Sequence, residues 1–221
     1  MLHADEIMRV LTRRYREPAE AAKATPWKVL LFTALSARTR DTQTEPAFRR
    51  VITAYQTPAA LSRAREADVA RLLNTIGLYR SKARNIVALA KMLTTQYKGR
   101  VPKDMDALVA LPAVGRKTAS CVLAYAFGIP AIAVDTHVFR IANRLGWTKE
   151  NTPEKTERAL RARIPKRHWI RINKVMVPFG REICGRIPKC WMCPVAEWCD
   201  FSEKTRAPKE KKNGTLEHGK L

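Results

Sequence analysis

Four cysteines near the C-terminal end of the chain have the residue type and the spacing of metal ligands. Cys184, Cys190, Cys193 and Cys199 follow the pattern C-x5-C-x2-C-x5-C. Clustered thiolates bind either zinc or iron–sulfur clusters, and the spacing alone leaves both groups open. The fifth cysteine, Cys121, falls within an apolar helical pattern and is predicted to belong to the core.

A second candidate site lies in the segment LPAVGRKTA, residues 111–119, which connects two helical patterns. A tight connection that contains a glycine, here Gly115, leaves backbone N–H groups pointing outward at the start of the second helix. These groups and the positive end of the helix dipole form a phosphate-binding site. We therefore predict that the segment contacts a nucleic-acid backbone through Ala113, Val114, Gly115 and Arg116. The alternative is an ordinary helix corner without a ligand.

Lys117, in the first turn of that second helix, could act as a nucleophile. The positive helix end and the adjacent Arg116 both disfavour the protonated amine, although a lysine here could also serve as a phosphate-binding cation. Asp135 is a predicted N-cap of the helix that begins near Thr136. A helix over 118–127 is ~15 Å long and the residues from 128 to 135 can span up to ~24 Å, so the chain can bring Asp135 back to Lys117.

The composition indicates a polyanionic partner. Lysine and arginine number 42 against 20 acidic residues, which gives a net charge of +22 along 221 residues. Ion-pair networks of the thermophilic kind need comparable numbers of both signs, so nucleic acid explains the excess better. No stretch approaches the ~20 apolar residues of a membrane helix, and the first residues read as an amphipathic helix rather than a signal peptide. A cytoplasmic protein is expected.

Helical patterns dominate the chain, and these helices must position the candidate residues. Apolar residues recur at helical spacing in 4–15, 27–37, 44–55, 66–75, 81–97, 104–111, 116–127, 136–145, 153–163 and 168–183. Thr-Pro pairs at Thr25, Thr57 and Thr152 predict helix N-caps. The segment 129–134 is predicted to be an extended connector, because a lone strand has no partner. The predicted fold class is therefore all-α.

The segments that contain these residues resemble those of the endonuclease III family, which belongs to the helix–hairpin–helix (HhH-GPD) superfamily of DNA glycosylases. The resemblance runs from about residue 5 to residue 200. It rests on LSARTRD (35–41), TIGLYRSKA (75–83), LPAVGRKTA (111–119), IAVDTHVFR (132–140) and the cysteine cluster. The spacing of 18 residues from Lys117 to Asp135 is also that of the family.

The resemblance implies DNA base-excision repair by a bifunctional glycosylase/AP lyase that removes oxidised pyrimidines from double-stranded DNA. Lys117 would attack C1′ of a flipped-out nucleotide, the base would leave, and β-elimination from the Schiff base would cut the strand. Asp135 would keep the lysine neutral and offset the charge that develops on the sugar. Leu78, which burial statistics alone assign to the core, would enter the vacated duplex. Arg38 would probe the gap that the flipped base leaves.

Two other functions remain open at this point. Monofunctional uracil or thymine mismatch glycosylases are similar in fold, but they lack a lysine at the position of Lys117 and leave the strand intact. A non-catalytic DNA-binding module would keep the hairpin and the cysteines for structure or recruitment. Such a module has no need for both Lys117 and Asp135 at this spacing.

For the cysteines, the resemblance implies a [4Fe–4S] cluster that holds a basic loop with Arg186 and Lys189 against the DNA backbone. The chain departs from the family in three places. The first cysteine gap has five residues where the family usually has six. Arg38 replaces a glutamine, and Ala113 replaces the first glycine of the hairpin. If this position requires a positive φ, the alanine carries a strain of roughly 1 kcal/mol.

The resemblance also implies two helical lobes with a DNA-binding cleft between them. Residues 20–130 would form a helical bundle that ends in the hairpin, and residues 1–19 with 131–200 would surround the cluster. Lys117 would lie on one wall of the cleft and Asp135 on the other. Residues 201–221 are polar and lysine-rich, and we predict a flexible basic tail. We expect a monomer that works at the nucleoid.

Overall fold

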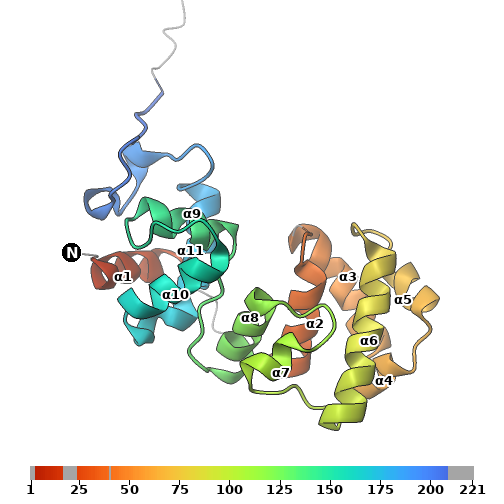
Figure 1. Cartoon of the computed structure of the whole chain (residues 1–221). Coiled ribbons are helices and arrows are strands. Elements are labelled where there is room, and N and C mark those ends of the chain that lie inside the picture. The colour runs from red at the N-terminus through yellow and green to blue at the C-terminus, as the bar shows by residue number, and fades with distance from the viewer. Residues whose placement is uncertain (1–2, 17–23, 40, 209–221) are drawn as a thin grey trace, which may run out of the picture.

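The computed structural model describes residues 3–16, 24–39 and 41–208, and this part of the chain contains no β-strand (Figure 1). In chain order the helices are α1 (Ala4–Arg14), α2 (Pro26–Ser36), α3 (Asp41–Ala54), α4 (Pro58–Ser62), α5 (Glu66–Leu72), α6 (Tyr79–Tyr97), α7 (Met105–Val109), α8 (Arg116–Phe127), α9 (Thr136–Arg144), α10 (Pro153–Arg163), η2 (Lys166–His168), α11 (Trp169–Glu182), η3 (Cys190–Met192) and η4 (Ala196–Trp198). The prediction of an all-α fold is confirmed, and 129–134 is an extended connector as predicted.

The three Thr-Pro pairs begin helices as predicted. In each pair the threonine Oγ1 accepts a hydrogen bond from the backbone N–H three residues later, at 3.4 Å for Thr25, 3.1 Å for Thr57 and 3.3 Å for Thr152. The proline then occupies the first helical position, where its missing N–H costs nothing. The short helix α4 is not among the segments with helical periodicity, and the sequence indicates it only through the Thr57 N-cap.

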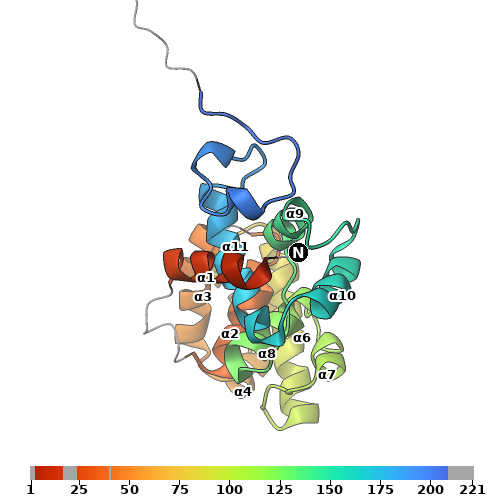
Figure 2. The ribbon, with the colours of Figure 1, turned by 90° about the vertical axis from the view of Figure 1, so that its left-hand side faces the viewer.

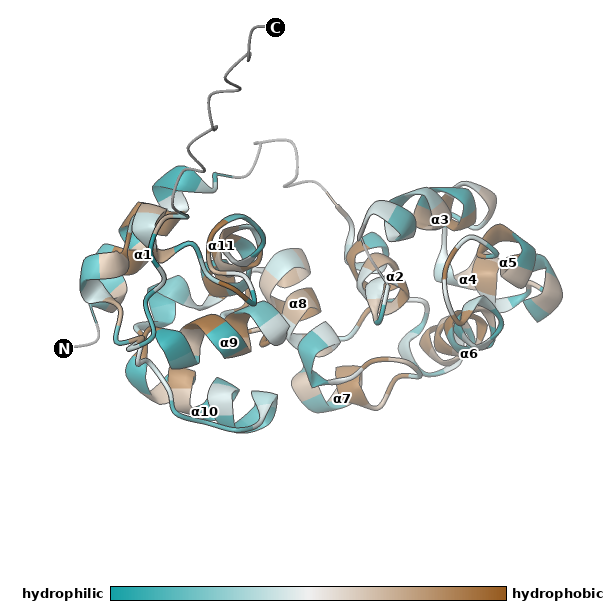
Figure 3. Ribbon diagram, turned by 90° about the horizontal axis from the view of Figure 1, so that it is seen from above, coloured by the Kyte–Doolittle hydropathy of each residue, from teal (hydrophilic) through white to brown (hydrophobic). Residues whose placement is uncertain are grey.

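The buried side chains of α2 to α8 form one hydrophobic core, which extends from Trp27 to Ala131 along the chain. The long helix α6 packs on α4 and α5, and α8 packs on α2 and α7. In Figure 3 the helices α2, α6 and α8 carry much of the hydrophobic colour of this half of the molecule. We propose that this core defines the first lobe.

A second hydrophobic core lies among α1, α9, α10 and α11. It includes Trp147 and Phe179, the two largest fully buried side chains of the described residues. The helix α1 is distant in sequence, but Ile7, Met8 and Leu11 are fully buried in this core, and the Arg14 guanidinium donates to the Glu182 carboxylate of α11 at 2.5 Å. We propose that this core defines the second lobe.

The helix α8 joins the two lobes. It packs against α2 in the first lobe and contacts α11 in the second, and Figures 1 and 3 both show it between these two helices. We call residues 184–199, which contain the four cysteines, the cysteine segment. Figures 1 and 2 place it at one end of the second lobe, beyond α9 and α11. Among the described residues, no helix is both long and apolar enough to cross a membrane.

The segment from Phe201 to Thr205 corrects the predicted start of the flexible tail. The Phe201 ring packs under the Arg144 guanidinium at 4.8 Å, and Lys204 Nζ donates to the Ala196 carbonyl at 2.9 Å. Thr205 Oγ1 accepts from the Cys190 backbone N–H at 3.2 Å. These residues therefore pack on the cysteine segment, and a tail can begin only after them. Residues 209–221 lie outside the described residues.

Candidate active site and cysteine cluster

The hairpin at 111–119 places one residue in a conformation that its type disfavours. Ala113 has φ of 61°, so the alanine occupies the left-handed region in which glycine is favoured. Gly115 does not adopt a positive φ, the conformation that glycine allows. It is an extended N-cap of α8 with φ of −87°. The expected strain thus falls on Ala113. Gly115 makes no side-chain cap bond, which leaves the first N–H groups of α8 without that partner.

Val114 and Arg116 differ in how they can meet DNA. The Val114 side chain is buried, so this residue could contact a phosphate only through its backbone. The Arg116 guanidinium forms a two-point ion pair with Glu157 of α10, with Nε–Oε2 at 2.6 Å and Nη2–Oε1 at 3.0 Å. Because the Glu157 side chain is only 5% exposed, this pair ties the hairpin to the second lobe. Contact of Arg116 with DNA stays a prediction.

Lys117 and Asp135 both lie near one buried thiol. Lys117 is an exposed residue in the first turn of α8, and Asp135 is half-buried before α9. Burial raises the pKa of the Cys121 thiol, while the nearby Lys117 lowers it through charge and a hydrogen bond and the Asp135 charge raises it. Cys121 is buried as predicted. The fold therefore returns Asp135 to the neighbourhood of Lys117.

One set of hydrogen bonds holds the Asp135 carboxylate, and a second set holds the connector that precedes it. Its Oδ1 accepts from the backbone N–H groups of His137 at 3.0 Å and Val138 at 2.8 Å, which confirms the predicted N-cap. The buried Asn173 of α11 donates to the Ala133 carbonyl in the preceding connector at 3.1 Å. The Tyr125 hydroxyl of α8 donates to Asn173 Oδ1 at 3.0 Å. A polar chain thus connects the helix of Lys117 with the connector that ends at Asp135.

The close packing of α9 on α11 depends on Gly180. A Cβ at this position would lie 2.4 Å from His137 Nδ1 and 3.1 Å from Arg140 Nη2. Gly180→Ala is therefore expected to displace α9 and to lower the free energy of unfolding by about 1–3 kcal/mol. Chemical denaturation measures this effect.

Gly185→Ala is the matched control for Gly180→Ala. A Cβ at Gly185 would meet its nearest atom at 3.5 Å, an ordinary contact. The control is expected to unfold like the wild type. If Gly180→Ala also unfolds like the wild type, Gly180 does not set the position of α9.

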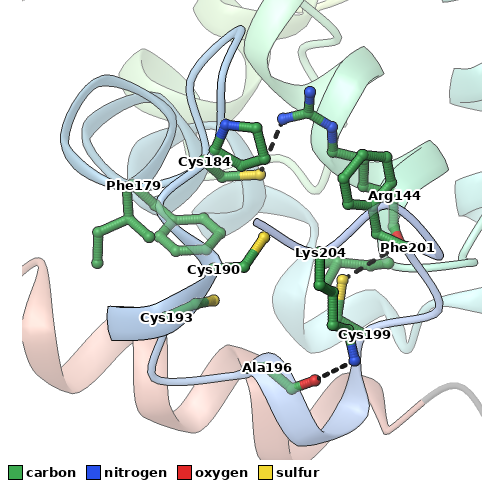
Figure 4. Close-up of a pocket in the computed structure, with 12 residues that line it drawn as sticks. Arg144, Phe179, Cys184, Cys190, Cys193, Ala196, Cys199, Phe201 and Lys204 are labelled. Atoms are coloured by element: carbon green, nitrogen blue, oxygen red, sulfur yellow. Dashed lines mark hydrogen bonds between the residues drawn. The ribbon is translucent and has the colours of Figure 1, made fainter. Parts of the chain in front are cut away.

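The four cysteines line one cavity together with Arg144, Phe179 and Phe201 (Figure 4). Figure 4 shows their sulfur atoms turned toward the same space: Cys184, Cys190, Cys193 and Cys199. Burial raises the pKa of the Cys193 thiol to about 11 and also raises the pKa of the Cys199 thiol, so burial alone favours the protonated form of both thiols. In the described part of the chain, no three Cys, His, Asp or Glu side chains are grouped as for a single metal ion.

Two arginines of α9 close the short first gap between the cysteines. Arg140 Nη2 donates to the Cys184 carbonyl at 2.9 Å. Arg144 donates to the carbonyls of Gly185 at 2.6 Å and Arg186 at 2.9 Å, and its Nη1 lies 3.5 Å from Cys184 Sγ. The loop is completed by the Lys189 N–H bond to the Ile183 carbonyl at 2.9 Å. The backbone of the five-residue gap is therefore held by donors from α9.

The predicted DNA-contacting residues fall into two groups on the surface. Arg38, Leu78 and Ala113 line a common cavity in the first lobe. Leu78, which burial statistics alone assign to the core, is 62% exposed. Arg186 and Lys189 are exposed on the cysteine loop.

Sequence reasoning missed Asn173, Arg140 and Arg144. The spacing of the two arginines by four residues on one helix face was the signal that could have found the last two.

The chain is similar to known DNA-repair proteins over most of its length. A family model described as HhH-GPD superfamily base excision DNA repair protein matches residues 32–166. Endonuclease III of Thermotoga maritima is 43% identical over 212 residues, which cover 96% of this chain and 98% of that protein. Endonuclease III of Escherichia coli K12 is 37% identical over 202 residues, which cover 89% and 96%.

Solved structures agree with this similarity. A non-covalent endonuclease III–DNA complex superposes with a TM-score of 0.81 at 36% identity, over 89% of this chain and 93% of that chain. A thermostable thymine-DNA glycosylase superposes with a TM-score of 0.80 at 25% identity, over 92% and 96%. The chain belongs to the endonuclease III family of the HhH-GPD superfamily of base excision DNA repair proteins.

Proposed function

We propose that the protein is a bifunctional DNA glycosylase/AP lyase that removes oxidised pyrimidines from double-stranded DNA, with Lys117 as the nucleophile and Asp135 as its carboxylate partner. The observation that carries the proposal is the exposed Lys117 at the start of α8, close to the Cys121 thiol, whose pKa the charge of Asp135 also raises. The family of the chain supports the reaction class. Because the proposed substrate is DNA, we place the protein at the nucleoid in the cytoplasm, and we expect it to act as a monomer.

Lys117 accounts for both steps of the reaction. The neutral amine attacks C1′ of the damaged nucleotide, the C1′–N bond breaks, and the base leaves with the bonding electrons and a proton. The remaining amine proton passes to the ring oxygen O4′ as the C1′–O4′ bond breaks, which gives a Schiff base between Nζ and C1′. Removal of a C2′ proton then expels the 3′ phosphate by β-elimination, and the strand is cut.

Asp135 would act on the charge that develops during base release. The hydrogen bonds from His137 and Val138 engage Oδ1, and Oδ2 takes part in neither. A fixed carboxylate near C1′ stabilises a positively charged sugar without reorganising during the reaction. It would also accept a proton from Lys117 and so keep the amine neutral.

The exposed residues at the cavity and the cysteine loop would hold the DNA. Leu78 would fill the space that the flipped nucleotide leaves, and Arg38 would face the opposing base. The N–H groups at Gly115 and the start of α8 would bind phosphate. Arg186 and Lys189 would neutralise further phosphates, so affinity is expected to fall steeply as the salt concentration rises.

Cys184, Cys190, Cys193 and Cys199 would hold a [4Fe–4S] cluster. Four thiols turned toward one space beside the N–H donors of Arg144 fit a group that takes thiolate ligands. When bound, the group supplies the cross-link that keeps the loop with Arg186 and Lys189 folded. Arg140 and Arg144 connect this loop to α9, which begins at Asp135.

A monofunctional mismatch glycosylase is the second candidate, favoured by the similarity in fold to a thymine-DNA glycosylase. Duplexes with thymine glycol, uracil, mismatched thymine, 8-oxoguanine or an abasic site distinguish the two when base release and nicking are scored separately. The proposed function predicts that thymine glycol is released and the strand is nicked at similar rates. Release of mismatched thymine or uracil without nicking would establish the alternative, and duplex binding without release would establish a non-catalytic module.

A further inference from the structure

Three residues with unusual backbone conformations surround one cavity of the first lobe. Arg38, Leu78 and Ala113 have φ of 55°, 58° and 61°, in the left-handed region that side chains disfavour. All three line a cavity of about 200 Å³ at the C-terminal end of α2, the N-terminal end of α6 and the hairpin. Strained residues of this kind persist only when their surroundings hold them in place. Some group must therefore fix the segment around Arg38.

The buried ammonium of Lys82 is that group. Its Nζ donates to the carbonyl of Leu35 at 2.5 Å, to the carbonyl of Ala37 at 2.8 Å and to the Thr39 hydroxyl at 2.5 Å. Three acceptors match the three N–H donors of an ammonium. Burial lowers the pKa of Lys82, whereas three oxygen atoms around Nζ favour the ammonium form.

The bonds of Lys82 enclose Arg38 on both sides. Ala37 and Thr39 are the chain neighbours of Arg38, and the Lys82 ammonium holds both of them. A cation also satisfies the last carbonyls of α2, which have no partner within the helix. The side chain of Arg38 itself stays exposed. Lys82 thus fixes the backbone and leaves the guanidinium outside.

The backbone of Lys82 is bonded to the other probing residue. Its N–H donates to the Leu78 carbonyl at 2.9 Å, and Leu78 is the left-handed N-cap of α6. Lys82 lies in the first turns of the same helix, on a rigid element. The distance between the Arg38 segment and Leu78 is therefore set by one side chain.

We propose that Lys82 is a positioning residue that sets where Arg38 stands relative to Leu78, and thereby determines how the enzyme discriminates among bases opposite the lesion. The proposal rests on the proposed function, because it assigns a cause to the placement of two residues that would enter the DNA. Lys82 itself touches no DNA in this account. Its effect is expected in the dependence on the opposing base, since a small displacement of a probing group costs catalysis where that group is used.

The test compares Lys82→Met, Lys82→Arg and Lys91→Met, an exposed lysine on the same helix. Single-turnover excision of thymine glycol is measured opposite A, G, C and T, together with KM. Lys82→Met is expected to lower the rate opposite the preferred base by roughly tenfold and to bring the four rates closer together. Lys82→Arg should recover part of the preference, and Lys91→Met should retain all of it.

Borohydride trapping on a single-stranded abasic oligonucleotide separates positioning from folding, because this substrate has no opposing base. Equal trapping by wild type and Lys82→Met, with altered opposing-base ratios, supports the proposal. Unchanged ratios in a folded Lys82→Met variant overturn it. If Lys82→Met does not fold, Thr39→Val removes one acceptor, and unchanged ratios in that variant overturn the proposal as well. Absence of trapping by the wild type on an abasic duplex would instead contradict the proposed function.

Discussion

Replacement of Lys117 by alanine is expected to abolish the covalent adduct that borohydride traps on abasic or damaged duplex DNA. The variant has no amine that can form the Schiff base, so strand cleavage should also disappear. Base release should fall by more than about a thousandfold, because loss of a nucleophile removes the covalent route entirely. Binding to intact duplex should change little, since one phosphate contact at most is lost. Gel-resolved trapping and single-turnover kinetics measure both effects.

Lys91→Ala is the matched control for this variant, because Lys91 is an exposed lysine of α6. It should trap and cleave like the wild type. Trapping at the wild-type level by Lys117→Ala would contradict the assignment of the nucleophile. Loss of nicking with unchanged base release would instead show that base release does not proceed through the lysine.

Replacement of Cys190 by serine is expected to disrupt the cysteine segment. Purified wild-type protein should be yellow-brown with absorbance near 400 nm, as thiolate-to-iron charge transfer produces, and the variant should lose most of it. Within the cysteine segment, Val195 is a fully buried apolar side chain. One such side chain provides little core, so folding of the segment should depend on the bound group. With Arg186 and Lys189 no longer held in place, DNA affinity should fall by about tenfold or more.

Cys121→Ala is the control for the absorbance, because Cys121 is a buried residue of α8 outside the cysteine cavity. It should keep the full absorbance near 400 nm. A colourless wild-type protein with stoichiometric zinc would refute the iron–sulfur assignment. Full absorbance in Cys190→Ser would show that Cys190 is not a ligand.

Much of the local structure could be predicted from the sequence, because its determinants lie within a few residues. The caps at Thr25, Thr57 and Thr152 and the N-cap at Asp135 depend on a side chain and an N–H two or three residues later. The four cysteines lie within one short segment and line one cavity. The chain length between Lys117 and Asp135 allows Asp135 to return toward Lys117.

Features that depend on distant residues could not be predicted. Arg116 reads as a phosphate ligand, but its partner Glu157 lies 41 positions later. The role of Lys82 depends on acceptors more than forty positions earlier, and periodicity gives no sign of them. Leu78 is exposed and has a left-handed backbone conformation. Neither property can be predicted from the residue type, because leucine is usually buried and disfavours a positive φ.

The most direct test of the account identifies the residue that becomes attached to DNA. Wild-type protein is trapped with borohydride on a thymine glycol duplex, digested with nuclease and protease, and the modified peptide is sequenced by mass spectrometry. A reduced sugar remnant is expected on Nζ of Lys117. A remnant on any other lysine or on the N-terminal amine, with Lys117 unmodified, would contradict it.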